Sequence, residues 1–420
     1  MMQKRERKKE MSAPKVRYGL LIGTFWPSMC ASYLLVVLLQ ERCMSNTAIG
    51  AVMAINSVIS ILVQPVWGTL CDWIGSVKKV FLLCSTATML LFTSLALIKN
   101  LPLLVAVIFL DALFRCSQIS LSDHWLVTAV NRYGGLDYGR VRVIGSITYA
   151  ATSGLYGLLQ QNYSMQAVIL ASGLFALFNV LAALLAPDTC EKPVQHRHTG
   201  LSAQIIHVFR IRPFAAVAIF LIFAGFSSSC TTNFMPNVFA RFGAGSQYVS
   251  FAQSLKALCE IPLFIAGGQL LKRFQSRRMI FLAASVTFCA YAGFVLASSP
   301  AAVVILHIFI GAGYSLMTTA KLHHVYQVVP AAWSATAFTV IGACEYGLGT
   351  ILGSYIGGWM LDRWPVQIVL LCSACAYLAG FLFFCLVSGK GGTGMSGQPP
   401  AATGPSANDA CLQKGSRRVN

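Results

Sequence analysis

The sequence has few charged residues. Asp, Glu, Lys and Arg together make up 10% of its 420 residues, and only 13 residues are acidic, whereas about 25% of the residues of an average soluble domain are charged. Apolar residues make up 56%, and the mean hydropathy is +0.67. A water-soluble fold cannot bury so much apolar surface, so we expect a protein that lies in a lipid bilayer.

The sequence also lacks the motifs of enzymes and of nucleic-acid-binding proteins. We find no nucleophile elbow, no phosphate-binding glycine loop and no Cys/His pattern that would hold zinc, so we predict no catalytic residue, no metal and no cofactor. The net charge of +18 is spread over short basic clusters between apolar runs, which does not fit a nucleic-acid partner. His196, His198 and His207 share one polar stretch and are interpreted as linker residues rather than metal ligands.

The sequence instead has a series of apolar runs, each near the roughly 20 residues that a helix needs to cross a bilayer. These runs predict an all-α polytopic membrane protein with twelve transmembrane helices in two six-helix halves. The expected spans are 18–40, 47–70, 80–98, 101–122, 143–160, 165–186, 214–240, 246–271, 279–297, 301–322, 331–360 and 365–387.

The distribution of basic residues predicts which side of the membrane each loop occupies. Of the 31 Lys and Arg residues, 25 fall on one side, in the N-terminus, the tail and every second loop, with Lys321 at the end of the span 301–322 counted among them. The opposite loops hold Arg42, Lys99, Arg241 and Arg363. Because loops rich in Lys and Arg stay cytoplasmic, we predict cytoplasmic termini in a plasma (inner) membrane protein.

These features divide the chain into five expected parts. A polar linker separates the two halves, and a C-terminal tail rich in Gly, Pro and Ser is predicted to be disordered. The parts are a basic cytoplasmic N-terminus at 1–17, a first half at 18–186, a cytoplasmic linker at 187–213, a second half at 214–387 and a cytoplasmic tail at 388–420.

A short motif recurs in the two halves. After the second span the sequence reads Gly68-Thr-Leu-Cys-Asp72-Trp-Ile-Gly75, followed by basic residues, and a related stretch begins at Gly268 after the eighth span, with Lys272 where Asp72 would lie. The first copy resembles the loop motif of the major facilitator superfamily, whose two halves are also a repeat. The resemblance implies that Gly68, Asp72 and Gly75 take part in gating, with Gly68 allowing close helix contact.

A second match lies between the fourth and fifth spans. Asp123 is followed by Tyr138-Gly139-Arg140-Val-Arg142-Val-Ile-Gly145-Ser146, which resembles the signature of the lactose-permease-like branch. That branch includes proton-coupled uptake of oligosaccharides, nucleosides and some aromatic acids. Asp123 and Arg142 are expected near the cytoplasmic mouth, as a gating ion pair or a static surface one. In that branch a histidine and a glutamate lie close together on the tenth span. No glutamate follows His307 here, so the resemblance does not extend to the branch's proton relay.

Few charged residues lie inside the predicted spans, where each costs about 2.5 to 3.5 kcal/mol at the membrane centre. Asp111 and Arg115 are four residues apart, as are Lys256 and Glu260, so each pair lies on one helix face. Each is either a self-contained ion pair or part of a substrate or proton site. Glu345 has no cation within a helical turn in sequence, so it is a candidate proton carrier. A hydrogen bond, or a pair with Lys256, is the alternative.

Neutral polar residues in both halves predict a cavity for a hydrophilic solute. His307 titrates near neutral pH when unperturbed and is a further coupling candidate, although a hydrogen bond to a neighbour is the simpler interpretation. Gly349, Gly353 and Gly357 predict tight helix contact. Trp26 would either stack on a ring of the solute or have an interfacial or packing role in the helix bundle. The cavity candidates are Trp26, Asn56, Gln64, Gln118, Asn233, Gln253 and Tyr314.

Together these features predict a secondary active transporter that acts as a monomer. It would take up a small hydrophilic solute, sugar-like or nucleoside-like, with protons as the coupling ion, by alternating access. A proton-driven exporter is an open alternative, because the sequence gives no direction of transport. A non-transporting membrane receptor or scaffold is the second alternative. The expected partners are the solute and the lipid bilayer.

Overall fold

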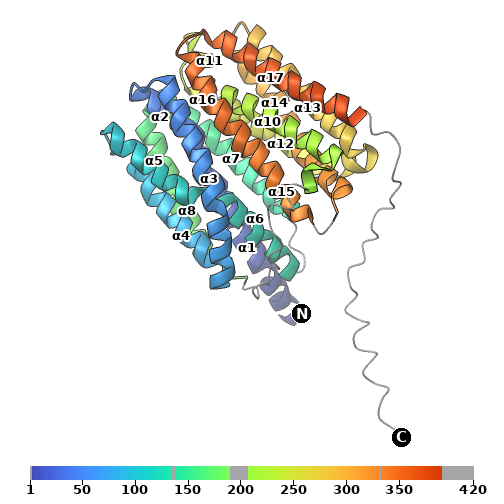
Figure 1. Ribbon diagram of the computed structural model, residues 1–420. Helices are drawn as coiled ribbons and strands as arrows, with labels where there is room; N and C mark the ends of the chain where they lie inside the picture. The colour runs from blue at the N-terminus through green and yellow to red at the C-terminus, as the bar shows by residue number, and fades with distance from the viewer. Residues whose placement is uncertain (1, 134–137, 190–206, 331–332, 390–420) are drawn as a thin grey trace.

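The computed structural model describes residues 2–133, 138–189, 207–330 and 333–389, and every regular element in these ranges is a helix (Figure 1). The first half contains α1 (Met2–Cys30), η1 (Ala31–Leu34), α2 (Leu35–Glu41), α3 (Asn46–Ile74), α4 (Val77–Ser94), α5 (Leu101–Arg115), α6 (Gln118–Arg132), α7 (Tyr138–Asn162) and α8 (Met165–Leu185). The second half contains α10 (Arg212–Thr232), α11 (Met235–Ala240), α12 (Gln247–Arg273), α13 (Ser276–Leu296), α14 (Pro300–Val328), α15 (Ser334–Gly342), η3 (Ala343–Gly349), α16 (Thr350–Leu361) and α17 (Val366–Gly389).

Ten helical segments of the described chain are long and apolar enough to cross a membrane. Two further segments, α7 and the continuous run from α15 to α16, complete the twelve that the sequence predicted. Both pack within the bundle, α7 against α1 and α12, and α16 against α3 and α10. Helices that line the interior of a bundle can carry more polar residues than lipid-facing helices. The prediction of an all-helical fold in two six-helix halves is confirmed.

Short polar side chains begin several of the helices. The side-chain oxygen of the residue before the helix accepts a hydrogen bond of 3.0–3.4 Å from the backbone N–H three residues on, which satisfies a donor that the helix start leaves unpaired. These residues are Ser45, Ser76, Asn100, Ser164 and Ser299. Gly75 ends α3 with a φ of +67°, and its N–H donates to the Cys71 carbonyl at 2.8 Å. This left-handed conformation favours glycine.

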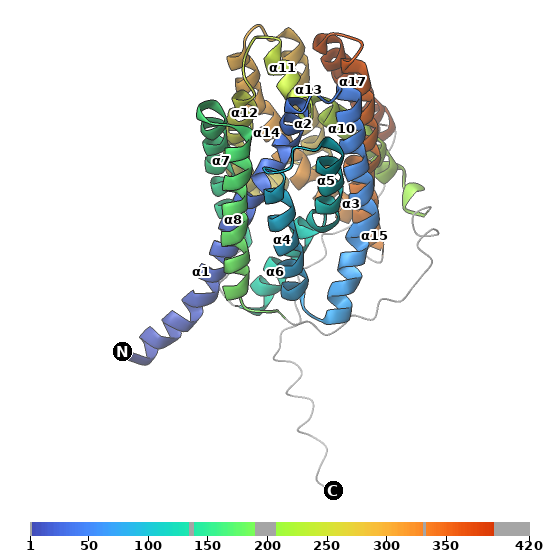
Figure 2. The ribbon, with the colours of Figure 1, turned by 90° about the vertical axis from the view of Figure 1, so that its left-hand side faces the viewer.

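Helix α1 begins at Met2, whereas the sequence predicted a separate basic segment up to residue 17. Lys, Arg, Glu, Met and Gln, which make up much of this stretch, all favour helix, so the basic segment extends the first transmembrane helix. Figure 2 shows this extension projecting from one end of the bundle. Residues 190–206 and 390–420 lie outside the described residues, so the linker and the disordered tail stay predictions.

The two ends of the bundle differ in how the halves meet. We call the end at which α1 begins the N-side, and the end that carries α2 and α11 the far side (Figure 2). Arg42, Lys99, Arg241 and Arg363 follow or precede helix ends at the far side, and Arg42 donates to the Lys99 carbonyl at 3.2 Å. The sparse basic residues therefore share one side of the bundle.

On the far side, Asp362 at the end of α16 binds the start of α3 in the other half. Its carboxylate accepts hydrogen bonds from the backbone and side chain of Asn46, at 2.9 and 3.0 Å, and of Thr47, at 2.8 and 2.6 Å. Gln40 donates to Asn237 at 2.6 Å, and Asn237 donates to Asn46 at 3.2 Å. We call these five residues the far-side latch.

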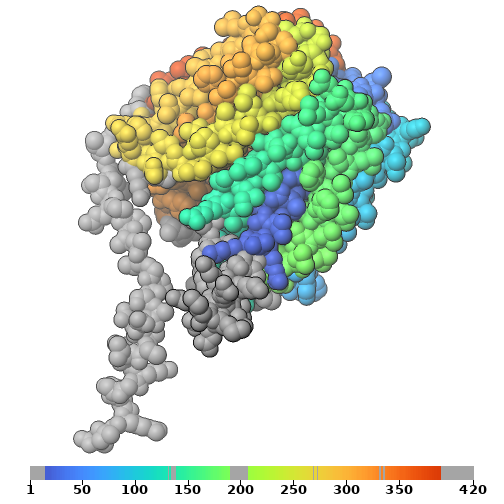
Figure 3. All heavy atoms as spheres, turned by 180° about the vertical axis from the view of Figure 1, so that it is seen from behind, coloured from blue at the N-terminus to red at the C-terminus, as the bar shows by residue number. Residues whose placement is uncertain are grey.

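Helices α7 and α12 form a second contact between the halves. Figure 3 shows the blue-green surface of α7 running beside the yellow surface of α12. Three hydrogen bonds of 2.7–2.9 Å join the parts of the two helices that lie toward the far side. They are Gln160 to Ser246, Ser153 to the Ser250 carbonyl, and Ser254 to the Ala150 carbonyl. The hydrogen bonds described between the halves thus lie toward the far side, which is closed.

Glycines let α16 approach its neighbours closely. A Cβ at Gly353 would collide with the Phe226 carbonyl of α10, and one at Gly357 would lie 2.8 Å from Cys230 Sγ. The predicted close contact of this glycine row is confirmed. Gly68 differs, because no atom lies within 4 Å of the position that its Cβ would take. The prediction that Gly68 allows close helix contact is therefore wrong for this conformation, since no neighbouring helix lies against this glycine.

Candidate functional site

A cavity of about 140 Å³ lies between the halves, on the N-side of the hydrogen bonds that join α7 and α12. We call it the interhalf cavity. Six of the residues that the sequence singled out meet here, from α1, α7, α12 and α14. The lining residues are Trp26, Arg142, Ser146, Tyr149, Gln253, Lys256, Ala257, Glu260 and Tyr314.

Trp26 and Arg142 form one wall of the interhalf cavity. The guanidinium carbon of Arg142 lies 4.0 Å from the centroid of the Trp26 ring, a cation–π contact. A Cβ at Gly145 would collide with the Trp26 indole, so glycine at this position lets the ring lie against α7. Arg142 therefore reaches the cavity itself, and its expected ion pair with Asp123 stays a prediction.

Lys256 and Glu260 form the opposite wall. Lys256 Nζ lies 3.7 Å from Glu260 Oε1, so the expected pairing along one face of α12 is confirmed. Lys256 Nζ also lies 5.0 Å from the centroid of the Tyr314 ring. The side chain of Glu260 is 14% exposed and that of Lys256 is 25% exposed, so both charges sit in a partly enclosed space.

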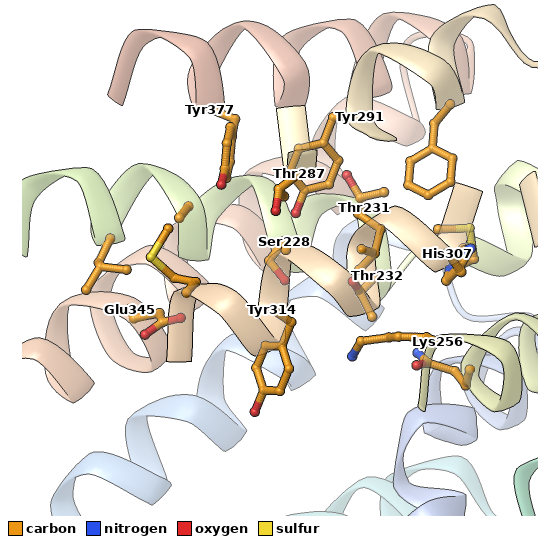
Figure 4. A pocket seen from close by; sticks show the side chains of 18 residues that line it. Ser228, Thr231, Thr232, Lys256, Thr287, Tyr291, His307, Tyr314, Glu345 and Tyr377 are labelled. Carbon is orange, nitrogen blue, oxygen red and sulfur yellow. The ribbon is translucent and has the colours of Figure 1, made fainter. Parts of the chain in front are cut away.

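A second cavity, of about 100 Å³, lies within the C-terminal half, and we call it the C-half cavity (Figure 4). His307 lines it, but His307 Nδ1 lies 2.8 Å from the Val303 carbonyl, one turn earlier on the same helix. The hydrogen-bonded alternative for His307 therefore holds. The polar lining residues are Ser228, Thr231, Thr232, Gln253, Lys256, Thr287, Tyr291, His307, Tyr314, Glu345 and Tyr377.

Glu345 has a cationic partner that the sequence analysis did not identify. Lys321 on α14 donates a short hydrogen bond to the Glu345 carboxylate, and the two side chains are 13% and 14% exposed. The expected alternative, a pair with Lys256, is wrong. Lys321 was counted with the cytoplasmic basic residues at the end of the expected span 301–322, but α14 continues to Val328, so Lys321 lies inside the helix.

The backbone at Glu345 is also unusual. Ala343–Gly349 is a π-helical segment, and the Thr350 hydroxyl donates to the Glu345 carbonyl at 3.1 Å. A Cβ at Gly225 would collide with this same carbonyl, so α10 approaches the segment closely. Short π-helical segments are rare and occur frequently at functional sites.

A third cavity, of about 230 Å³, is lined mainly by the N-terminal half, and we call it the N-half cavity. It brings together Asp111, Arg115, Asn56 and Asn233. Arg115 Nε donates to Asp111 Oδ2 at 2.7 Å, which confirms the expected pairing of this couple. The second oxygen of Asp111, Arg115 Nη2 and Asn56 Oδ1 are buried without a hydrogen-bond partner.

Other sequence candidates lie outside the three cavities. Gln118 donates to the Cys84 carbonyl and to Thr88, at 3.1 and 2.6 Å, and so links two helices. Gln64 donates to Ser120. The expectation that Gln118 lines a cavity is therefore wrong, because its amide is used between helices, whereas Gln64 is exposed and its place in a cavity stays a prediction. Asp72 is exposed.

Of the three histidines of the polar linker region, the structure describes one. His196 and His198 lie outside the described residues, and the ring of His207 stacks on Trp333 with 5.4 Å between centroids. Among the described residues, no group of three or more His, Cys, Asp or Glu side chains could hold a metal ion.

Sequence reasoning missed several residues of the site. Tyr291 and Tyr377 line the C-half cavity from α13 and α17, which read as plain apolar spans. Asp362 and its partners in α3 are 315 or 316 residues apart. The one signal in the sequence was the position of Tyr291 and Tyr377, amphipathic residues several positions inside apolar runs.

Comparisons with known proteins agree with this architecture. The model of the "MFS_1 like family" matches residues 22–371. A maltose permease of Geobacillus stearothermophilus is 25% identical over 358 residues, covering 84% of this chain and 89% of the permease. A raffinose permease of Escherichia coli is 22% identical over 373 residues, covering 83% and 87% of the two chains.

Solved structures show the same fold. The crystal structure of the nucleoside transporter NupG matches with a TM-score of 0.71 at 17% identity, and the match covers 90% of this chain and 98% of NupG. Because the family model spans most of the chain, membership does not depend on these distant likenesses. The chain belongs to the MFS_1 like family, and is a membrane transporter of the major facilitator superfamily rather than an enzyme.

Proposed function

We propose that this transporter takes up a small hydrophilic solute, a sugar or a nucleoside, together with protons. The observation that carries the proposal is the interhalf cavity, where Trp26, Arg142 and Glu260 meet between the two halves. An aromatic face can stack on a sugar ring or a base, and charged groups form strong hydrogen bonds with hydroxyls. An apolar solute would instead leave these charged groups without partners in a site of low dielectric constant.

The position of the cavity relative to the hydrogen-bonded contacts supports alternating access. The far-side latch and the three α7–α12 hydrogen bonds close the halves on one side of the cavity. Rocking of the halves about the central cavity would open this side and close the N-side. A solute bound by residues of both halves would then face the two sides of the membrane in turn.

The ion pair between Lys321 and Glu345 supports proton coupling. A proton on Glu345 would remove its charge and so break the pair, leaving the Lys321 ammonium to find another partner. Tyr314 lies between Glu345 and Lys256 and lines both the C-half and the interhalf cavity (Figure 4). A change in the charge of Glu345 would therefore alter the surroundings of Tyr314, which lines the cavity proposed to hold the solute.

The relatives support the choice of solute. Two of them are named as permeases of maltose and raffinose, and the structural relative NupG as a nucleoside transporter. Sugars and nucleosides share hydroxylated rings, which the polar cavities suit. We also propose that the N-side is cytoplasmic, because the basic residues collect there, that the membrane is the plasma (inner) membrane, and that the protein works as a monomer.

Solute counterflow into proteoliposomes tests this proposal without requiring a proton gradient. Vesicles loaded with unlabelled maltose, raffinose or uridine are diluted into trace labelled solute, and transient accumulation of label is expected for at least one of them. Arg142→Gln should reduce the initial rate at least tenfold, because the cavity loses its guanidinium. Arg140→Gln is the matched control, since Arg140 is exposed and is not a lining residue of the three cavities. Absence of counterflow for every solute, with inserted protein, would favour a receptor or scaffold.

A further inference from the structure

We infer that the N-half cavity binds an alkali cation, held by the unpaired carboxylate oxygen of Asp111 and by neutral oxygens of α3. The ion would be a ligand of its own, separate from the solute and from Glu345, the proposed proton carrier. The inference goes beyond the proposed function and does not depend on which solute is transported.

The carboxylate of Asp111 has one oxygen in use and one without a partner. Oδ2 accepts the hydrogen bond from Arg115 Nε at 2.7 Å, whereas Oδ1 is buried without a hydrogen-bond partner. Asp111 as a whole is only 3% exposed. A charged oxygen buried to this degree costs free energy unless a ligand meets it. Because Asp111 lines the N-half cavity, that ligand would lie in the cavity.

The serine hydroxyls that line the N-half cavity are oriented to accept and not to donate. Ser57 and Ser60 on α3 each donate to the backbone carbonyl four residues earlier, at 3.2 and 2.9 Å. Ser32 in η1 donates to the carbonyl three residues earlier, at 2.7 Å. A hydroxyl has one hydrogen, so only the oxygen lone pairs are left for a ligand. The side-chain oxygen of Asn56 is also buried without a partner.

A set of oxygens with few hydrogens to give suits a hard cation, which takes oxygen ligands. Asp111 is the one acidic residue that lines the cavity, and Arg115 already neutralises part of its charge. A divalent ion would therefore leave excess positive charge in a partly enclosed site, which is costly, so a monovalent ion fits better. Transition-metal sites differ, and no group of three or more His, Cys, Asp or Glu occurs among the described residues.

Contacts on the guanidinium of Arg115 leave Asp111 Oδ1 to the ion. The guanidinium carbon lies 4.5 Å from the centroid of the Phe92 ring, and Nη1 lies 3.7 Å from Met29 Sδ. The ion and the guanidinium would thus each take one oxygen of the same carboxylate. The cavity of about 230 Å³ also has room for waters, each of which takes roughly 30 Å³. A water bound to the ion could accept from Arg115 Nη2, which is buried without a partner.

Two residues of the second half also line the N-half cavity. The Thr350 hydroxyl donates to the Glu345 carbonyl at 3.1 Å, and the Asn233 amide donates to Ser354 at 2.9 Å. The side-chain oxygens of Thr350 and Asn233 are further candidate ligands. An ion that binds this conformation and not the unfolded chain stabilises the protein by mass action.

Thermal unfolding of the purified full-length protein tests the site in the absence of any solute. NaCl or KCl replaces choline chloride while the ionic strength is held constant. At least one of the two salts should raise the melting temperature in a saturable way. Asn56→Ala and Ser60→Ala each remove one oxygen and keep the pair of Asp111 and Arg115, so each should raise the half-saturating ion concentration at least fivefold.

Thr69→Val is the matched control for the loss of a hydroxyl from α3. Thr69 also donates to the carbonyl four residues earlier, at 3.2 Å, but it is exposed and lines none of the three cavities. The half-saturating ion concentration of Thr69→Val should equal that of the wild type.

Equilibrium dialysis with radioactive Na⁺, or with Rb⁺ in place of K⁺, measures binding directly. One ion should bind to each wild-type molecule, and none to the double variant Asp111→Asn/Arg115→Gln. This variant removes both charges together, so that neither is left unpaired in the bundle.

Three results would overturn the cation site. The first is the same melting temperature in all three salts. The second is the same half-saturating concentration in the wild type, Asn56→Ala and Ser60→Ala, or an unchanged number of bound ions in the double variant. The third is weaker binding of maltose or uridine to Asn56→Ala and Ser60→Ala while no salt has an effect, because the cavity would then hold the solute. The counterflow assay enters none of these results, so the proposed function is tested separately.

Discussion

Lys321 and Glu345 form an ion pair that links α14 to the π-helical segment of the eleventh span. Both side chains are mostly buried, so water screens and solvates the two charges only in part. Removing one member of a buried pair leaves an uncompensated charge and costs about 3–5 kcal/mol, whereas replacing both members can be nearly neutral.

We therefore expect Glu345→Gln to lower the melting temperature strongly, because it leaves the Lys321 ammonium unpaired. The double variant Lys321→Gln/Glu345→Gln should recover most of the stability. If the pair also carries the coupling proton, the stable double variant should still lack solute-driven proton movement. Thermal unfolding of detergent-solubilised protein and pH-dye fluorescence of proteoliposomes measure the two effects. Proton movement that survives in the folded double variant would contradict the role of Glu345.

The far-side latch predicts a dependence on pH. Burial alone would raise the pKa of Asp362, but hydrogen bonds from Thr47 and Asn46 hold it below its ordinary value of 3.8. A lowered pKa means that the ionised carboxylate stabilises the closed far side at pH values above 3.8. This stabilisation is lost as the pH falls through the lowered pKa. At neutral pH the latch should be fully ionised and closed.

Asp362→Asn removes the charge at every pH and should open the far side. Because Asp362 is exposed, we expect only a three- to tenfold rise in the open population. The measurement is alkylation from the far side of Ser354→Cys, a position buried against Gly50 of α3. Arg363→Gln is the control, since Arg363 bonds the Trp359 carbonyl within its own helix turn. Equal alkylation of the two variants would rule out the latch.

The glycine row of the eleventh span predicts a sharp steric effect. Gly353→Ala places a methyl group against the Phe226 carbonyl and Ser229 hydroxyl of α10, and overpacking of this kind costs about 1–3 kcal/mol. Gly68→Ala meets no atom within 4 Å and should leave the melting temperature unchanged or slightly raised. The contact is unimportant if the two variants melt at the same temperature.

Gly145 predicts an effect on solute affinity rather than on stability alone. Gly145→Ala pushes the Trp26 ring away from α7 and so disturbs the contact between Trp26 and Arg142. We expect the dissociation constant for the transported solute to rise at least fivefold. Gly19→Ala is the control, because its Cβ would make an ordinary 3.6 Å contact with Ile144. An unchanged dissociation constant in Gly145→Ala would count against Trp26 as a solute contact.

Much of the fold could be predicted from the sequence. Apolar runs and the alternation of Lys and Arg gave twelve spans, and the i,i+4 spacing gave the pairs Asp111–Arg115 and Lys256–Glu260, because both signals are local. Gln118 was misassigned, because an amide inside a span can face a cavity or a neighbouring helix, and the sequence does not say which.

The long-range pairs could not be predicted. Glu345 meets Lys321, 24 residues earlier, because the packing of the bundle brings α14 and the η3 segment close enough for the two side chains to meet. The start of α3 meets Asp362 only because the halves close on the far side. Both contacts depend on how helices pack, which hydropathy and loop charge do not encode.

The most direct test of proton-coupled uptake is the internal pH of proteoliposomes when solute is added outside. The account predicts acidification of the lumen by at least one sugar or nucleoside, such as maltose or uridine, and none in the stable Lys321→Gln/Glu345→Gln variant. Alkalinisation of the lumen on addition of solute would instead indicate proton antiport and export. Solute accumulation with no change in internal pH would contradict the proton coupling on which the account depends.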